Sequence, residues 1–257
     1  MQDEALQLEW MTSPEAAEAI RSGMRSIVVP CGAIEQHGAH LPLSVDADHA
    51  RRLGPMVAKR IGNCLVAPVI KTGCSSHHMK FAGTISLRDE TLEALLRDYC
   101  ASLATHGFTR IFIFSAHVGN CPVLKKILPA LRDAVPAGCE VNAFVDSSLW
   151  LQTWRSSVEA AGGDAARVGG HADIAETSLM LILRRDRVLM EKAAQGHVGL
   201  LDEEKLNLMW REGIGGISPN GILGDARGAA SNIGERCLND MADMLAGFFS
   251  GAEPAAS

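Results

Sequence analysis

Apolar runs alternate with amphipathic segments along most of the chain. Short runs of apolar residues bounded by turn-forming residues predict buried strands, and longer segments whose apolar residues recur every three or four positions predict helices. The predicted strands are 26–30, 64–70, 110–116 and 140–148, and the predicted helices are 12–21, 48–61, 89–107, 120–135, 173–186 and 234–249. Residues 187–225 are less periodic.

This alternation of strands and helices predicts an α/β sandwich with a mainly parallel sheet. A capping box, Thr12 followed by Glu15, marks the start of the first predicted helix. No internal repeat or low-complexity linker divides the chain, so we expect one domain over residues 1–250. The tail, residues 251–257, is expected to be disordered.

The composition of the chain argues against several classes of protein. The 257 residues are 47% hydrophobic and 21% charged, with a formal net charge of −6, which is unlike the basic surface of a nucleic-acid binder. No apolar run approaches the roughly 18 residues of a transmembrane helix, and the acidic first residues do not resemble a signal peptide. The seven cysteines contain no CxxC pair and do not suggest a disulfide framework. We expect a cytoplasmic protein without a nucleic-acid or membrane partner.

Ligand-type side chains gather in one irregular segment, GAIEQHGAHLPLSVDAD, residues 32–48. It supplies Glu35, His37, His40, Asp46 and Asp48, just after the first predicted strand. His117 directly follows the strand 110–116, and His171 and Glu176 lie in GGHADIAE at the entry to a helix. Ligands of parallel sheets bind beyond the carboxyl ends of the strands, so we expect these distant segments to meet at one edge.

Each of these residues also has an ordinary structural interpretation. A histidine after a strand is commonly a loop residue, and Asp46 or Asp48 before a helix is commonly a cap or a first-turn acid. Glu176, however, precedes SLMLIL, which predicts a helix buried on most sides, where a carboxylate is costly unless it is paired or metal-bound.

Together, these imidazoles and carboxylates form a mixed nitrogen and oxygen donor set. Such a set suits Zn²⁺, Mn²⁺ or Fe²⁺, and one carboxylate shared between two ions would make a site about 3.5–4 Å across. A thiolate site using Cys31, Cys74 or Cys121 is the alternative, although small buried cysteines are common.

Several segments of the chain resemble motifs of the creatininase (creatinine amidohydrolase) family. The first is residues 32–48, and FAGTISL (81–87), SAHVGN (115–120), HADIAETSLML (171–181) and GDARGAASNIGE (224–235) follow in the family's order. The resemblance covers roughly residues 25–250. It implies a three-layer α/β/α sandwich, a binuclear metal centre and a ring-like homohexamer.

The resemblance also implies roles for individual residues. Glu35 and His117 would bind one divalent metal ion, and His37 and Glu176 the other, with Asp46 bridging; the ions would be Zn²⁺ and/or Mn²⁺, or Fe²⁺. His171 would pass a proton to the leaving nitrogen, with a pKa near neutrality. Ser75 and His78 would contact the substrate.

Other positions depart from creatininase itself. Gly119 stands where that enzyme has a glutamate, its pocket residues before the histidine are replaced here by Arg167, Val168 and Gly170, and SAH stands where many relatives have NGH. We therefore expect a metal-dependent amidohydrolase that uses a metal-activated water on the C–N bond of a small amide, cyclic or open, other than creatinine.

Three alternatives stay open. One is a deformylase or peptidase acting on a larger modified substrate. Another is a metal-dependent lyase or isomerase, which would polarise a carbonyl without adding water. The third is a non-catalytic binding protein that keeps the fold and a single metal ion.

Overall fold

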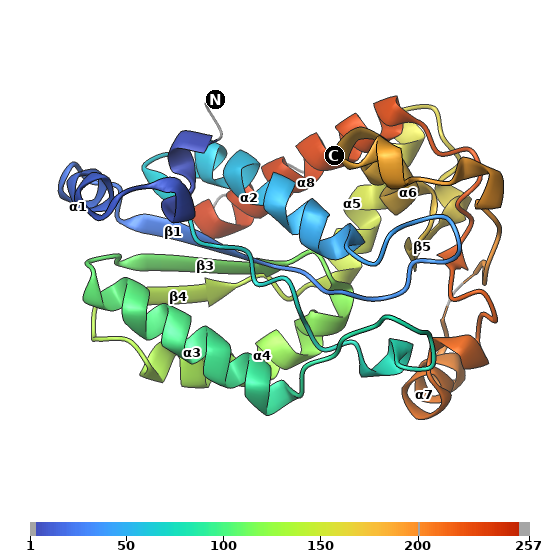
Figure 1. Cartoon of the computed structure of the whole chain (residues 1–257), viewed down its shortest axis with the longest axis horizontal. Helices are drawn as coiled ribbons and strands as arrows, with labels where there is room; N and C mark the ends of the chain where they lie inside the picture. Colours follow the sequence, from blue (N-terminus) through green and yellow to red (C-terminus); the bar gives the residue numbers. More distant parts are fainter. Residues whose placement is uncertain (1–3, 200, 252–257) are drawn as a thin grey trace.

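A parallel sheet forms the centre of the computed structural model of this chain, which describes residues 4–199 and 201–251. In this part of the chain the central sheet has four strands in the order β2-β1-β3-β4, all parallel (Figure 1). The strands are β1 (Ser26–Cys31), β2 (Cys64–Val66), β3 (Arg110–Ser115) and β4 (Glu140–Ala143).

Helices cover both faces of this sheet. On one face lie α2 (Val45–Ile61), α5 (Ser147–Ala160), α6 (Ile174–Leu183) and α8 (Ser231–Ser250), and on the other α3 (Asp89–Thr105) and α4 (Cys121–Asp133) (Figure 1). The remaining α-helices are α1 (Ser13–Arg21) and α7 (Glu203–Glu212). β5 (Val168–His171) and β6 (Leu223–Gly224) form a separate antiparallel pair. Short 3₁₀ helices are η1 (Glu4–Leu6), η2 (Leu8–Trp10), η3 (Ser76–His78), η4 (Val118–Asn120), η5 (Ala165–Arg167), η6 (Arg185–Arg187), η7 (Met190–Lys192) and η8 (Ile214–Gly216).

The alternation of side chains along β1 explains the layers. Ile27 and Val29 point into a core shared with α3 and α4, whereas Val28 points into a second core shared with α2, α5, α6 and α8. Because successive residues of a strand face opposite sides, a wholly apolar strand must be covered on both faces. The three-layer α/β/α sandwich is therefore confirmed.

Two strands end several residues earlier in the structure than the sequence predicts, each for a local reason. β2 stops at Val66, opposite Val28, and the pairing resumes with a shift of one residue where Ile70 lies opposite Cys31. The predicted strand 140–148 ends at Ala143, since the Asp146 side chain accepts a hydrogen bond from the Leu149 backbone N–H at 2.9 Å and so begins α5.

Two helices, α5 and α7, were not predicted. α1, by contrast, starts as expected, with the Thr12–Glu15 capping box formed. Within the described residues, no helix is both long and apolar enough to cross a bilayer. Residues 252–257 of the predicted tail lie outside the described residues, and the single-domain assignment stays a prediction.

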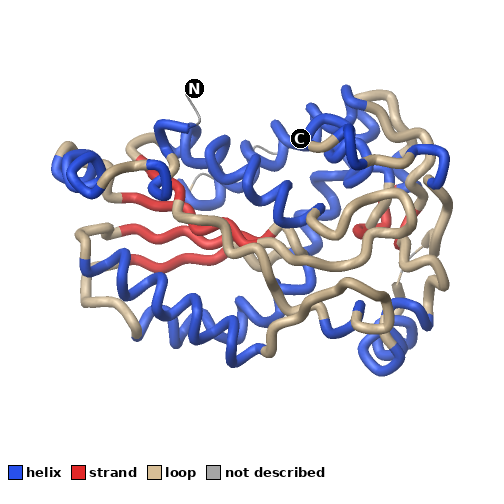
Figure 2. The backbone as a smooth tube through the Cα atoms, viewed as in Figure 1, coloured by secondary structure: helices blue, strands red, loops and turns tan. Residues whose placement is uncertain are grey.

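Loops that leave the carboxyl ends of the strands gather at one end of the sheet (Figure 2). They include the long connection from β1 to α2 and the short one from β3 to η4. The antiparallel pair β5–β6 lies at the same end (Figure 2). The ligand-type residues of the sequence all belong to this region.

Candidate metal centre

Seven buried polar side chains meet at this end of the sheet. The β1–α2 connection contributes Glu35 and His37, and His117 follows β3; the others are Asp46 in the first turn of α2, His78 of η3, His171 at the end of β5 and Glu176 in the first turn of α6. All seven are buried. The β1–α2 connection lies close against α2, where a Cβ at Gly32 would be 2.7 Å from the backbone of Ala47, so only glycine fits there.

Asp46 lies between two groups of these side chains. His37 Nε2 is 3.4 Å from Asp46 Oδ1 and 3.5 Å from Glu176 Oε2. On the other side, His117 Nδ1 is 3.5 Å from Asp46 Oδ2 and 3.3 Å from Glu35 Oε1. Two atoms bound to one tetrahedral zinc at about 2.0–2.1 Å lie about 3.3–3.5 Å apart. The spacing on each side of Asp46 is therefore that of a set of metal ligands.

Backbone carbonyls fix the orientation of two imidazoles. His37 Nδ1 lies 3.1 Å from the carbonyl oxygen of Glu35, and His117 Nε2 lies 3.2 Å from that of Cys74. A carbonyl only accepts hydrogen bonds, so these nitrogens carry the protons and donate. The opposite nitrogen of each ring is then left as a donor atom for a cation, which is how a metal-ligating histidine is commonly held.

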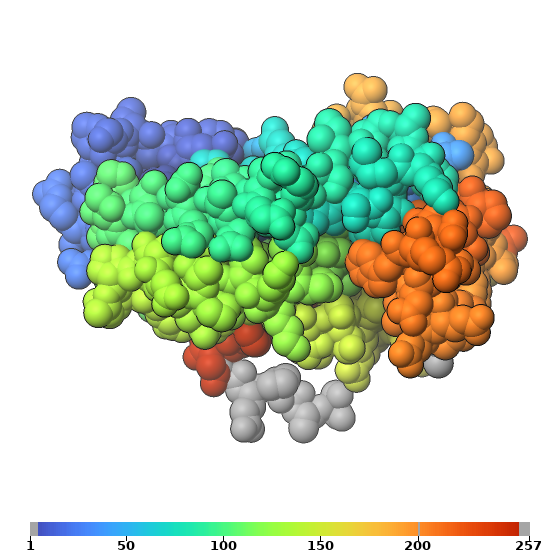
Figure 3. All heavy atoms as spheres, turned by 90° about the horizontal axis from the view of Figure 1, so that it is seen from below, coloured from blue at the N-terminus to red at the C-terminus, as the bar shows by residue number. Residues whose placement is uncertain are grey.

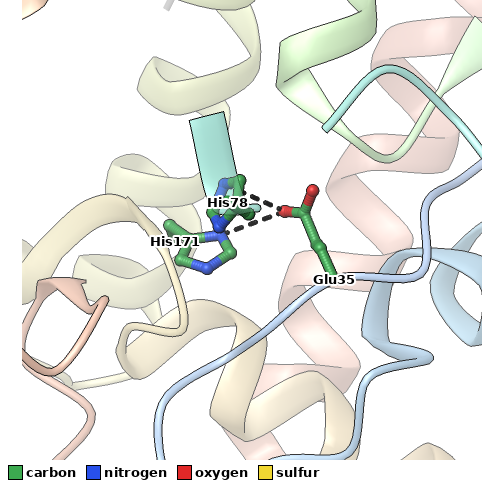
Figure 4. Close-up of side chains that lie close together, drawn as sticks. All are labelled: Glu35, His78 and His171. Atoms are coloured by element: carbon green, nitrogen blue, oxygen red, sulfur yellow. Dashed lines mark ion pairs between the residues drawn. The ribbon is translucent and has the colours of Figure 1, made fainter. Parts of the chain in front are cut away.

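His171 and His78 approach Glu35 differently (Figure 4). His171 Nε2 donates to the carbonyl oxygen of Gln36 at 2.8 Å, which leaves its Nδ1, 3.5 Å from Glu35 Oε1, free to bind a proton or a cation. The Gln36 amide is oriented by the Gly38 N–H, which donates to its oxygen, so its nitrogen donates to His78 Nδ1 at 2.9 Å. A neutral His78 therefore carries its proton on Nε2, 3.4 Å from Glu35 Oε1.

The charges of this cluster are poorly compensated by the protein. Burial raises the pKa of Asp46 to about 6 against the opposing charge of His37. Burial opposes a charge on His117, yet Glu35 and Asp46 raise the pKa of that imidazole to about 9. Burial likewise disfavours the ionised Glu35, but His117 and His78 hold its pKa well below the usual range.

His171 differs from the expectation of a pKa near neutrality. Burial lowers its pKa well below the ordinary value, and positive charge on His37 and His78 acts in the same direction, against the attraction of Glu35. The pKa of His37 shifts in the opposite direction. Burial would lower it, but Asp46 and Glu176 raise it well above the ordinary value.

The donor set fits divalent cations. Within the described residues, both carboxylate oxygens of Glu35, Nε2 of His37 and Oδ2 of Asp46 are buried without a hydrogen-bond partner. Buried polar atoms are rarely left this way, and bound cations on the two sides of Asp46 would satisfy them. The described residues also contain three groups whose ligand atoms lie within 4.8 Å of one another: Glu35–Asp46–His117, His37–His171–Glu176 and Glu35–His78–His171.

Some ligand-type residues of the sequence lie outside the cluster. His40 Nε2 is 2.9 Å from the Thr177 hydroxyl, and Asp48 accepts a hydrogen bond from the Ser44 hydroxyl at 2.7 Å. Ser75 is fully buried, with its hydroxyl 3.5 Å from His117 Nε2, and it lies behind that imidazole rather than among the residues that line the cavity. Its substrate contact stays a prediction, as do the other assigned roles.

The cysteines do not join the cluster. All seven lie in the described segments and are free. No cysteine of the described residues belongs to the three groups of clustered ligand atoms, and burial raises the pKa of both Cys31 and Cys121 to about 12, which disfavours a thiolate nucleophile.

A cavity of about 550 Å³ opens onto the cluster. Glu35, Asp46, His117, His171 and Glu176 line its floor, together with His78. No sequence pattern selects Gln36, which orients the site, or His77, which lines it. The wall formed by α7 was also missed, although Asp202 before this helix and Gly213 after it are ordinary start and stop signals.

A parallel α/β/α sandwich with buried imidazoles and carboxylates at its strand ends defines a candidate metal-dependent enzyme. The family model of creatininase, described as creatinine amidohydrolase, matches residues 9–249. The chain therefore belongs to the creatininase family.

Named relatives of the chain include a peptidase and an amidohydrolase. A mycofactocin precursor peptide peptidase of Mycobacterium ulcerans (strain Agy99) is 36% identical over 226 residues, covering 85% of this chain and 82% of the relative. A creatinine amidohydrolase of Pseudomonas putida is 31% identical over 191 residues, covering 71% and 73%. A crystal structure of creatinine amidohydrolase (creatininase) matches with a TM-score of 0.73 and 25% identity, covering 95% of this chain and 98% of that one.

Proposed function

We propose that this chain is a binuclear metal-dependent hydrolase that cleaves an amide C–N bond. Glu35 and His117 would hold one divalent cation, His37 and Glu176 would hold the other, and Asp46 would contact both. The observation that carries this proposal is the position of Asp46, whose two oxygens face different imidazoles at 3.4 and 3.5 Å. A shared carboxylate of this kind is typical of two-metal hydrolytic sites.

The identity of the cations follows from the donor atoms. Nitrogen and oxygen ligands suit Zn²⁺, Mn²⁺ and Fe²⁺. Two similar solved structures are described as a Mn creatininase and as a creatininase variant of Zn-Zn type. We therefore propose Zn²⁺ or Mn²⁺ here. When bound, such ions lower the pKa of a water toward about 7 and polarise a carbonyl group.

The protein residues would hold the reactants and move the proton. His171 Nε2 is tied to the Gln36 carbonyl, so Nδ1, which faces the cluster 3.5 Å from Glu35 Oε1, is the ring atom at which this histidine would take up and release a proton. That proton would go to the departing nitrogen. His78 Nε2 donates toward Glu35 and would orient this carboxylate. Burial of all these groups excludes bulk water from the reaction.

The size of the cavity helps to choose between the candidate substrates. A cavity of about 550 Å³ is larger than a small cyclic amide requires and is within the usual range for drug-sized ligands. One creatininase variant was solved with creatine, a small molecule, whereas the 36% identical relative acts on a peptide precursor. The cavity favours the larger of these substrates, so a peptide-like amide is our first choice and a small amide the second.

Elemental analysis of purified protein, with a hydrolysis panel of blocked peptides and small cyclic amides in Zn²⁺ or Mn²⁺, tests this proposal. We expect close to two metal ions per chain and incorporation of ¹⁸O from labelled water into the product. Turnover without incorporated oxygen would instead indicate a lyase or isomerase. Full metal occupancy without turnover of any amide would favour a binding protein.

Assembly and location follow from the family and from the sequence, respectively. We propose a homo-oligomer, a hexamer by family resemblance, which light scattering of the purified protein would measure. The cytoplasmic location stays a prediction.

A further inference from the structure

One wall of the cavity is apolar and has no part in the proposed chemistry. α7 supplies Leu206 and Trp210, which are four positions apart and therefore on the same face of the helix, and both line the cavity. They remain 38% and 53% exposed. Met209, three positions after Leu206, also lines the cavity but is buried, and it packs with Ile214 and Leu223. The buried Met209 thus anchors α7, while Leu206 and Trp210 beside it present exposed apolar surface to the cavity.

Trp210 rests on a histidine that is itself stacked on the metal-site cluster. The indole packs edge-on against the His77 imidazole, with ring centroids 5.0 Å apart and an interplanar angle of 63°. His77 in turn stacks on His117 at 5.8 Å and 13°. The contact requires glycine at position 119, because a Cβ at Gly119 would lie 2.9 Å from His77 Cε1 and 2.3 Å from His117 Nε2.

These contacts fix the wall close to the reacting groups. Through His77, the indole of Trp210 is two ring contacts away from a residue assigned to a cation. The surface of α7 lies beside that of the segment containing η3, on the same side of the molecule (Figure 3). A group bound against Trp210 would therefore lie in the same cavity as the scissile bond rather than at a distant surface.

We propose that Leu206 and Trp210, supported by His77, form a subsite that binds an apolar side chain adjacent to the scissile amide. This inference rests on the proposed function. Its physical basis is the hydrophobic effect: exposed apolar area at the mouth of a catalytic cavity gains free energy when a substrate covers it. Hydrolysis would accordingly favour amides flanked by leucine-like or aromatic groups over those flanked by charged ones.

Two metal-binding probes separate the wall from the cluster. Acetyl hydroxamate and isocaproyl hydroxamate share the group that binds a cation and differ only in an apolar chain. Their affinities for Mn²⁺-loaded protein are measured by calorimetry for the wild type, Trp210→Ala and Trp10→Ala. Trp10 is a matched control, since it is 54% exposed and does not line this cavity.

We expect the wild type to bind isocaproyl hydroxamate about 10-fold more tightly than acetyl hydroxamate. Trp210→Ala should remove most of this preference and leave the affinity for acetyl hydroxamate and the metal content unchanged, and Trp10→Ala should change neither. His77→Phe keeps a ring under Trp210 and should retain the preference, whereas His77→Ala should weaken it.

The outcomes are distinguishable. An equal affinity of the wild type for both probes, or a preference that survives Trp210→Ala, would overturn the subsite and leave the proposed function standing. Binding of neither probe would overturn the metal-dependent function and the subsite with it. A changed oligomeric state of Trp210→Ala at unchanged preference would assign the wall to a contact between copies, against the proposal.

Discussion

Replacing Asp46 by asparagine should reverse the order of stability between metal-free and metal-loaded protein. The substitution keeps the size of the side chain and removes the charge that faces His37 and His117. In metal-free protein the charge of Asp46 destabilises the fold, because burial raises the pKa of Asp46 from 3.8 to about 6. In metal-loaded protein the same carboxylate would be the shared ligand.

The pKa shift gives the sign and the size in the metal-free state. An acid with a raised pKa binds its proton more tightly in the folded chain, so its ionisation destabilises the fold. The penalty is absent below pH 3.8, grows between pH 3.8 and about 6, and is complete above that. About two pH units at ~1.4 kcal/mol each give ~3 kcal/mol. At pH 7 we expect metal-free Asp46→Asn to be more stable than wild type by up to this amount.

Metal ions should invert this difference. A ligand present at 100 times its Kd stabilises the native state by about 2.7 kcal/mol per site, so two occupied sites would contribute about 5 kcal/mol. The wild type should gain most of this and Asp46→Asn little, because each half of the cluster loses the shared Asp46 carboxylate and keeps only one acid and one imidazole, Glu35 with His117 and Glu176 with His37. Activity should be lost in the same variant.

Denaturant unfolding followed by circular dichroism, in a chelator and in excess Mn²⁺, measures both effects. Asp48→Asn is the control, since Asp48 lies in the same turn of α2 but bonds to Ser44 outside the cluster. Repeating the metal-free comparison near pH 4 should shrink the difference. If Mn²⁺ stabilises Asp46→Asn as strongly as wild type, Asp46 is not a shared ligand and the two-cation proposal is wrong.

Three further substitutions, one of them with a matched control, test other parts of the site. His171→Ala should lower the hydrolysis rate about 10²–10⁴-fold at unchanged metal content by elemental analysis, and loss of metal would mean that His171 is a ligand. Gly119→Ala should destabilise the chain by about 1–3 kcal/mol in thermal unfolding and weaken metal binding, because its Cβ would lie 2.3 Å from His117 Nε2; Gly247→Ala, where a Cβ meets nothing within 4 Å, should stabilise it by roughly 0.5–1 kcal/mol instead. Asp173→Ala should cost about 3 kcal/mol, since its carboxylate accepts the N–H groups of Gly169, Gly170, Ala175 and Glu176, and an unchanged unfolding midpoint would contradict this.

Local sequence patterns predicted most elements of the fold. The four central strands and six of the helices were predicted because each has its own apolar period and its own start or stop signal. α5 was missed because it follows β4 after only three residues, and the predicted strand 140–148 included this connection and the first two residues of the helix, Ser147 and Ser148. α7 was missed because its apolar residues serve the cavity and a small separate core rather than the main one.

The positions of the seven cluster residues were partly predictable for a similar reason. Glu35, Asp46 and His117 stand at strand ends or at a helix start, where the topology of a parallel sheet gathers side chains. Gln36 was not predictable, since its role arises from contacts with His171 and Gly221, 135 and 185 positions away. No local pattern records which nitrogen of an imidazole a distant carbonyl will hold.

Candidate metal ligands can be recognised by the free energy that their burial costs the folded chain. Glu35, Asp46 and Glu176 are carboxylates buried together, and the protein supplies only imidazoles to compensate them. Hydrogen bonds to backbone carbonyls fix two of these imidazoles with a bare nitrogen toward the acids, which is unfavourable unless a proton or a cation lies between. A chain built for stability alone would replace such a group by apolar residues. From its presence in an otherwise apolar sandwich we expect folding and the proposed cation binding to be coupled, so that stripping the cations should loosen this end of the sheet first.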